Sequence, residues 1–256
     1  MGILRGKRVL VTGLTMASSI AYQVASVAQA EGAEVVVSNF GRALGLTRRV
    51  VQRLDPVPQV IELDVTEADH LAGLADQLRD SLGGLDGLVH SVAYANPERA
   101  LGGAFLSTEW EDVATSLRVS AYSLAELVRA CQPVLAPGAA VVGLTFDASV
   151  SWPAYDWMGV SKAALESVSR YLARYLGPQG VRCNIVSAGP INSIAKQSIT
   201  GVEGLDQLWS GRAPLGWDPE DAKPTAQAVV ALLSDWFPST TGEIVHVDGG
   251  LHSTGA

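Results

Sequence analysis

Short apolar runs alternate with amphipathic stretches along the whole chain, and this alternation constrains the fold more than any other feature. The runs cover residues 7–12, 33–38, 57–63, 85–90, 139–144, 181–187 and 243–247, and they read as strands buried on both faces. Helical patterns lie between them near 19–31, 43–54, 67–82, 109–135, 155–176 and 221–236. Seven strands interleaved with six helices predict an α/β fold with a parallel, doubly wound sheet of the Rossmann type.

The chain has the length of one large α/β domain, 256 residues, and no repeat, low-complexity segment or linker composition divides it. We therefore predict a single domain over residues 1–256. The longest stretch without clear periodicity follows the sixth predicted strand. We expect a substrate-binding flap there, over about residues 192–218.

The composition excludes several classes of partner. A net charge of −8 argues against nucleic acid and against an anionic membrane surface. No apolar run approaches the ~20 residues of a membrane span, and the start of the chain enters a strand pattern without a signal peptide. Cys131 and Cys183 lie far apart and are expected to be reduced core thiols, and no cluster has metal-ligand spacing. These features predict a cytoplasmic protein without a metal.

Candidate cofactor-binding residues gather where the predicted strands end, which is where open α/β sheets bind their ligands. The first strand ends at Gly13, and Ser19 and Ile20 open a helix after it, without a GxGxxG motif. Backbone N–H groups and hydroxyls at a helix N-terminus can bind a pyrophosphate. By itself the pattern is equally consistent with Ser18 and Ser19 capping the helix.

Further signals follow the next three strands. Phe40 is placed to stack on an adenine, or it is an ordinary core residue. Asp64 and Val65 end the third strand, where a carboxylate could accept from the adenine amino group or cap the helix near Glu67. Ser91–Ala93 end the fourth strand with small side chains, as close approach of a ribose requires.

The residues after the second strand bear on the choice between NADH and NADPH. A ribose 2′-phosphate usually demands a basic pocket, and a 2′-hydroxyl usually meets a carboxylate. The stretch Asn39–Arg42 contains one arginine and no acidic residue, so neither pattern is clear. We expect NADH, with NADPH less favoured.

Tyr155 and Lys162 are seven residues apart in a predicted helix. Side chains at that spacing lie two turns apart and about 20° out of alignment, so both can face one cleft. Taken separately, Tyr155 fits an aromatic side chain packing at a helix start and Lys162 fits a solvated surface lysine. Together they place a phenol donor and a cation at one site.

Motifs along nearly the whole chain resemble those of the enoyl-acyl-carrier-protein reductases, a divergent branch of the short-chain dehydrogenase/reductase superfamily. They include GLTMASSIA at 13–21, LDV at 63–65, HSVAYA at 90–95, SAYS at 120–123, TFD at 145–147, PAYDWMGVSKAALES at 153–167 and SAGPI at 187–191. The order of the motifs and their residues look most similar to those of the NADH-dependent, actinobacterial-type members.

The resemblance implies a role for each matching residue. Tyr155 would donate a hydrogen bond to the thioester carbonyl, Lys162 would hold the nicotinamide ribose, and Phe146 would lie beside the nicotinamide and the acyl double bond. The residues implied to line the dinucleotide are Ser19, Ile20, Asp64, Val65, Val92, Ala93 and Ile191, with Ser193 near the pyrophosphate.

The resemblance also implies a homotetramer and a substrate carried on acyl carrier protein, with coenzyme A as the open alternative. Trp152 and Lys196 stand at acyl-pocket positions that are usually smaller or apolar, and Met158 is expected to contact substrate. Around the flap, Lys196 and Arg212 are offset by Glu203 and Asp206, which is thin support for docking an acidic carrier.

The position of the tyrosine separates two chemistries within the superfamily. The usual carbonyl-reducing arrangement puts tyrosine four residues before the lysine, and that position is Met158 here, which has no proton to give. Reduction of a 2-enoyl thioester delivers hydride to C3 while negative charge collects on the thioester oxygen, further from the nicotinamide. We expect NADH-dependent reduction of a trans-2-enoyl thioester in acyl-chain biosynthesis. The alternatives are a carbonyl reductase and a catalytically silent NAD-binding regulator.

Overall fold

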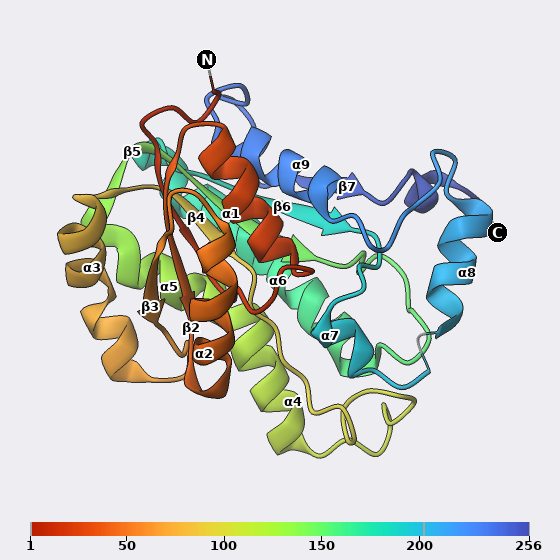
Figure 1. Cartoon of the computed structure of the whole chain (residues 1–256). Helices are drawn as coiled ribbons and strands as arrows, with labels where there is room; N and C mark the ends of the chain where they lie inside the picture. Colours follow the sequence, from red (N-terminus) through yellow and green to blue (C-terminus); the bar gives the residue numbers. More distant parts are fainter. Residues whose placement is uncertain (1, 202, 256) are drawn as a thin grey trace.

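The computed structural model describes residues 2–201 and 203–255, and these contain a parallel seven-stranded sheet in the order β3-β2-β1-β4-β5-β6-β7 (Figure 1). The strands are β1 (Arg8–Val11), β2 (Glu34–Asn39), β3 (Gln59–Glu62), β4 (Leu85–His90), β5 (Leu135–Thr145), β6 (Arg182–Ala188) and β7 (Ile244–Val247). Each neighbouring pair is parallel. The predicted Rossmann-type fold is confirmed, and the strand order reverses between β1 and β4.

Helices cover both faces of the sheet (Figure 1). They are α1 (Ile20–Ala30), α2 (Gly41–Val50), α3 (Ala68–Leu82), α4 (Trp110–Leu117), α5 (Ser123–Cys131), α6 (Asp156–Leu176), α7 (Ile194–Gln197), α8 (Glu203–Arg212) and α9 (Lys223–Leu233). Apolar residues of α1 and α9 pack on one face, and those of α3, α5 and α6 pack on the other. Among the described residues, no helix is both long and apolar enough to span a bilayer.

The strands are apolar at successive positions because each face of the sheet has its own core. In β1, Leu10 points into the core beneath α3, α5 and α6, whereas Val9 and Val11 point into the core beneath α1 and α9. Cys131 and Cys183 are fully buried in the first of these cores, and burial raises the pKa of both thiols to about 12. Both are free thiols in the core, which confirms the prediction of reduced core thiols.

The single helix predicted over 109–135 is divided. A π-helical segment, Arg118–Tyr122, separates α4 from α5, and a 3₁₀ turn follows at Gln132–Val134. Within the π segment, the Ser120 hydroxyl accepts from the Tyr94 N–H at 2.9 Å and donates to the Tyr94 carbonyl at 3.0 Å. The irregularity thus ties the chain that leaves β4 to the helix layer.

The predicted flap contains two helices that the sequence pattern did not indicate, α7 and α8. Leu205 and Trp209 on α8 are 6% and 1% exposed, so this helix packs against the body of the protein. Position 202, between the two helices, lies outside the described residues. The flap's boundaries and the single-domain organisation stay predictions.

Candidate active site

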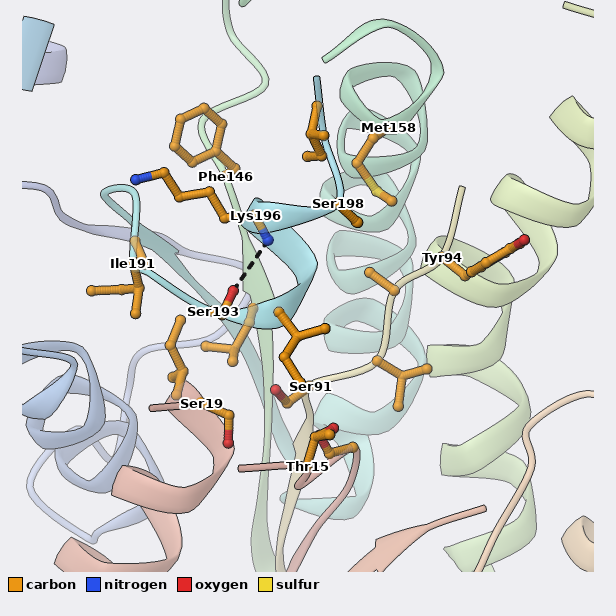
Figure 2. A pocket seen from close by; sticks show the side chains of 18 of the residues that line it. Thr15, Ser19, Ser91, Tyr94, Phe146, Met158, Ile191, Ser193, Lys196 and Ser198 are labelled. Atoms are coloured by element: carbon orange, nitrogen blue, oxygen red, sulfur yellow. Dashed lines mark hydrogen bonds between the residues drawn. The ribbon is translucent and has the colours of Figure 1, made fainter. Parts of the chain in front are cut away.

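A crevice of about 590 Å³ opens beyond the carboxyl ends of the strands, at the reversal between β1 and β4. Its volume is typical of small-molecule sites. Figure 2 looks into it. The predicted site residues that line it are Gly13, Ser19, Ile20, Phe40, Val65, Ser91, Val92, Ala93, Phe146, Tyr155, Met158, Lys162, Ile191, Ser193 and Lys196.

Gly13 forms the part of the crevice where β1 and β4 end side by side. Its φ is +73°, and a Cβ placed on it would lie 2.1 Å from the Ser91 carbonyl oxygen. Only glycine fits this backbone approach. The result is a cradle formed by the closely approaching ends of β1 and β4, at the edge of the sheet where a dinucleotide can bind.

Two serines at the crevice are helix caps. Ser19 precedes α1, where its hydroxyl accepts from the Tyr22 N–H at 3.2 Å and donates to the Met16 carbonyl at 2.6 Å. Ser193 precedes α7 and accepts from the Lys196 N–H at 3.3 Å. The capping interpretation therefore holds, and it leaves the N-terminus of α1 at the crevice, where an anion is favoured.

Two predicted site residues are not among the residues that line the crevice. The Asp64 carboxylate accepts from the backbone N–H and the hydroxyl of Thr66, at 2.8 and 2.7 Å, so it organises the turn before α3. It does not cap α3, whose N-cap residue is Glu67. Trp152 packs behind Phe146 instead, with ring centroids 5.3 Å apart. Phe40, in contrast, lines the crevice and is 43% exposed, which leaves its ring open to a ligand.

Lys162 lies on α6 with only 7% of its surface exposed. Its ammonium donates to the Leu144 carbonyl at the end of β5, at 2.9 Å, and retains donors for a ligand in the crevice. Burial lowers the pKa of Lys162 to about 8, although the Glu166 carboxylate favours the charged form.

Glu166 lies one turn beyond Lys162 on α6, and sequence reasoning missed it. The half-buried carboxylate accepts from the Thr145 hydroxyl at 3.1 Å, and burial raises its pKa. Its spacing of four residues from Lys162 could have indicated it, because side chains four apart on a helix are neighbours. It supplies the negative charge nearest in sequence to the buried ammonium.

Tyr155 immediately precedes α6 and lies against Phe146, with ring centroids 5.2 Å apart and planes inclined by 61°. Burial of the phenol raises its pKa above the ordinary value of 10. Tyr155 is therefore a neutral donor throughout the physiological range.

Phe146 is the centre of an aromatic cluster that also contains Trp152, Tyr155 and Trp209. The Trp209 ring lies 5.5 Å from Phe146 and 5.0 Å from Trp152. The Trp152 indole N–H donates to the Asp147 carbonyl at 2.6 Å and fixes the chain after β5. The cluster holds Phe146 against Tyr155 from behind.

Sequence reasoning found the start of the segment that follows β4 but missed its later part, which includes Ala100 and Leu101. Ala95, Ala100 and Leu101 pack with Met158 in a small buried cluster, and Ala95 and Leu101 line the crevice. Because this segment is irregular, it carries no strand or helix period that could mark it in the sequence.

Comparisons with known proteins identify the family. The family model described as enoyl-(acyl carrier protein) reductase matches residues 13–252, nearly the whole chain. The chain belongs to this family. Among the relatives of this reductase, the Mycolicibacterium smegmatis protein is 44% identical over 97% of both chains, and the Mycobacterium avium protein is 45% identical over 97% of both.

A more distant relative of this reductase, from Aquifex aeolicus, is 37% identical over 100% of this chain and 94% of its own. All three carry the name enoyl-acyl-carrier-protein reductase with NADH. The family resemblance inferred from the motifs is thereby confirmed.

Proposed function

We propose that this chain reduces the C2–C3 double bond of a trans-2-enoyl thioester to the saturated thioester, using NADH. The observation that carries the proposal is that Tyr155 and Lys162 line one crevice while Met158 lies between them. The thioether of Met158 offers no proton at the position one turn before the lysine. The phenol is thus placed one turn further from the buried ammonium than in a carbonyl-reducing arrangement.

The crevice fits a dinucleotide. Gly13 allows a close backbone approach to Ser91 at the crevice that any Cβ would prevent, the N-terminus of α1 favours a pyrophosphate, and the half-exposed Phe40 offers a stacking face. A bound NADH would supply the hydride. Lys162 would hold the ribose hydroxyls, since its ammonium is fixed by the Leu144 carbonyl and still has donors.

Tyr155 would stabilise the charge that develops on the thioester oxygen. Because burial keeps the phenol neutral, it can donate a hydrogen bond to that oxygen as the enolate forms. Phe146 and the rings behind it limit where the Tyr155 ring can lie and keep water from that side of the crevice.

NADH is favoured over NADPH by the names of the relatives and by the region after β2. Those relatives are named for NADH. The crevice there is lined by Asn39 and Phe40, and the next residue but one, Arg42, is not among the lining residues. A 2′-phosphate would find little basic charge at this edge.

The substrate carrier and the assembly are extensions of the same proposal. The relatives are named for acyl carrier protein, which we propose as the carrier here, with coenzyme A thioesters as usable substitutes. We also propose a homotetramer, because Tyr171 and Tyr175 on α6 are 63% and 69% exposed in the single chain. A cytoplasmic location stays a prediction.

The test follows loss of NADH or NADPH absorbance with enoyl thioesters of several chain lengths, beside a 3-ketoacyl thioester of matched length. The proposal requires turnover of the enoyl substrates with NADH. Turnover of the ketoacyl substrate alone would favour a carbonyl reductase, and binding of NADH without any turnover would favour a silent regulator.

A further inference from the structure

Lys196 on α7 and Asp206 on α8 form an ion pair that ties the two flap helices together. The Lys196 ammonium also donates to the Asn192 side-chain oxygen at 2.7 Å. The two charged side chains are 13% and 38% exposed, so the pair is partly removed from water. We call Asn192, Lys196 and Asp206 the flap clasp.

The clasp lies at the wall of the crevice. Lys196 and Leu205 line it, whereas Asp206, the next residue on α8, does not. In Figure 2 the Lys196 side chain runs beneath the Phe146 ring, and its ammonium points away from Tyr94 and Met158. Asp206 and Asn192 thus draw the charge outward and leave the methylene stem of the lysine facing the crevice.

The ion pair also reduces the charge that the flap can offer to an acidic carrier protein. Lys196 is engaged by Asp206, and Arg212 donates to the Gly255 carbonyl at the other end of α8. The side chain of Glu203 lies outside the described part of the chain. Because both cations already have partners within the chain, they are poor candidates for carrier recognition.

α8 is held on its inner side as well. Leu205 and Trp209 are buried with Phe146 and Trp152 in one cluster. A long acyl chain that passed between α7 and α8 would have to part these helices. It would then either break the ion pair or place methylene groups against partly desolvated charges, and both are unfavourable.

We propose that the flap clasp determines substrate specificity: it closes the crevice between α7 and α8 and restricts the enzyme to short and medium-length acyl thioesters. This inference rests on the proposed function, because it concerns the acyl chain of that substrate. It assigns Lys196 and Asp206 a positioning role and gives them no part in hydride or proton transfer.

The test measures kcat/KM with NADH for a series of trans-2-enoyl coenzyme A thioesters, from crotonyl to hexadecenoyl. While added methylenes find apolar surface, kcat/KM should rise by up to about fourfold per methylene, and it should stop rising where the crevice ends. In the wild-type protein the rise should stop at a medium chain length. In the Lys196→Met/Asp206→Leu variant it should continue to longer chains, each value being compared with that variant's own crotonyl kcat/KM.

Two further variants separate this role from general damage to the flap. Arg212→Gln removes the other flap cation, which lies on α8 with Asp206, and should keep the wild-type cut-off. The charge-reversed variant Lys196→Asp/Asp206→Lys should restore a cut-off if the pair itself closes the crevice. If the apolar double variant fails to fold, Asp206→Asn carries the same comparison, because it weakens the pair without changing its volume.

An identical chain-length cut-off in the wild type and in the Lys196→Met/Asp206→Leu variant would overturn the inference. A shifted cut-off in Arg212→Gln that matched this apolar variant would overturn it equally, since flap disturbance alone would then suffice. Absence of turnover with every enoyl thioester in the wild type would instead contradict the proposed function. The two failures are therefore distinguishable.

Discussion

The Tyr155 ring stands edge-on to the Phe146 ring, with centroids 5.2 Å apart and planes inclined by 61°. The two rings come from different segments, since Tyr155 immediately precedes α6 and Phe146 immediately follows β5. Each therefore limits the orientation of the other. This contact gives the phenol a fixed position from which to act as a hydrogen-bond donor.

Tyr155→Phe should lower kcat by about 10²–10³-fold, the usual effect of losing one donor to a developing oxyanion. The ring contact with Phe146 survives the change, so the fold and the NADH affinity should be nearly unaltered. Steady-state kinetics with a titration of NADH binding check both. Unchanged kcat would remove Tyr155 from the mechanism.

Moving the phenol to the carbonyl-reducing position should not restore enoyl reduction. In Tyr155→Phe/Met158→Tyr, the hydroxyl would stand one helical turn nearer Lys162 than in the wild type. We expect kcat for a 2-enoyl thioester to stay at the Tyr155→Phe level, with Met158→Leu as the control for repacking the buried Met158 site. Recovery to wild-type kcat would contradict the importance of the phenol's position.

Gly13→Ala should destabilise the protein by on the order of 2–4 kcal/mol and abolish NADH binding. The added Cβ would lie 2.1 Å from the backbone carbonyl of Ser91, and φ is +73°, so neither residue can relax easily. Gly45→Ala on α2 is the matched control, since nothing lies within 4 Å of its Cβ. Denaturant unfolding and NADH titration measure the two effects, and equal behaviour of both variants would refute this account of the cradle.

Lys162 should make stability depend on pH in a defined direction. Burial lowers its pKa from 10.5 to about 8, so between these values the unfolded chain holds a proton that the folded chain has released. The folded state is therefore favoured by this group as pH rises through that window. Relative to Lys162→Met, the NADH-free wild type should gain on the order of 3 kcal/mol between pH 7 and 10.5.

Urea unfolding of the wild type and Lys162→Met across this range isolates the lysine from the other titrating groups. A difference between them that is flat with pH would mean that Lys162 is not desolvated as its burial indicates. The measurement needs no catalytic turnover, so it stands apart from the assignment of the reaction.

The sequence was sufficient where regular packing dictates residue type. Leu10 and its neighbours Val9 and Val11 serve opposite cores, so an unbroken apolar run is what a central parallel strand requires. Gly13 and Ser91 could be placed at one site for the same reason, because parallel strands deliver their carboxyl ends to one edge.

The rest depended on contacts between distant segments. The cluster around Phe146 joins α8 to the crevice, and the cluster around Met158 joins the segment after β4 to it. No local periodicity in the sequence indicates either contact. The π-helical break is set by Ser120 bonding to Tyr94, a side-chain contact that a helical pattern does not reveal. Asp64 and Trp152 followed the expected motifs, but their side chains turn to local partners instead of lining the crevice.

The most direct test of conjugate reduction is the position of the transferred hydrogen. A trans-2-enoyl thioester should be reduced with NADH that carries deuterium in the transferable C4 position, and the product analysed by NMR. The account predicts deuterium on C3 of the saturated acyl product. No saturated product from the enoyl thioester, with deuterium found only on the carbinol carbon formed from a 3-ketoacyl thioester, would contradict it.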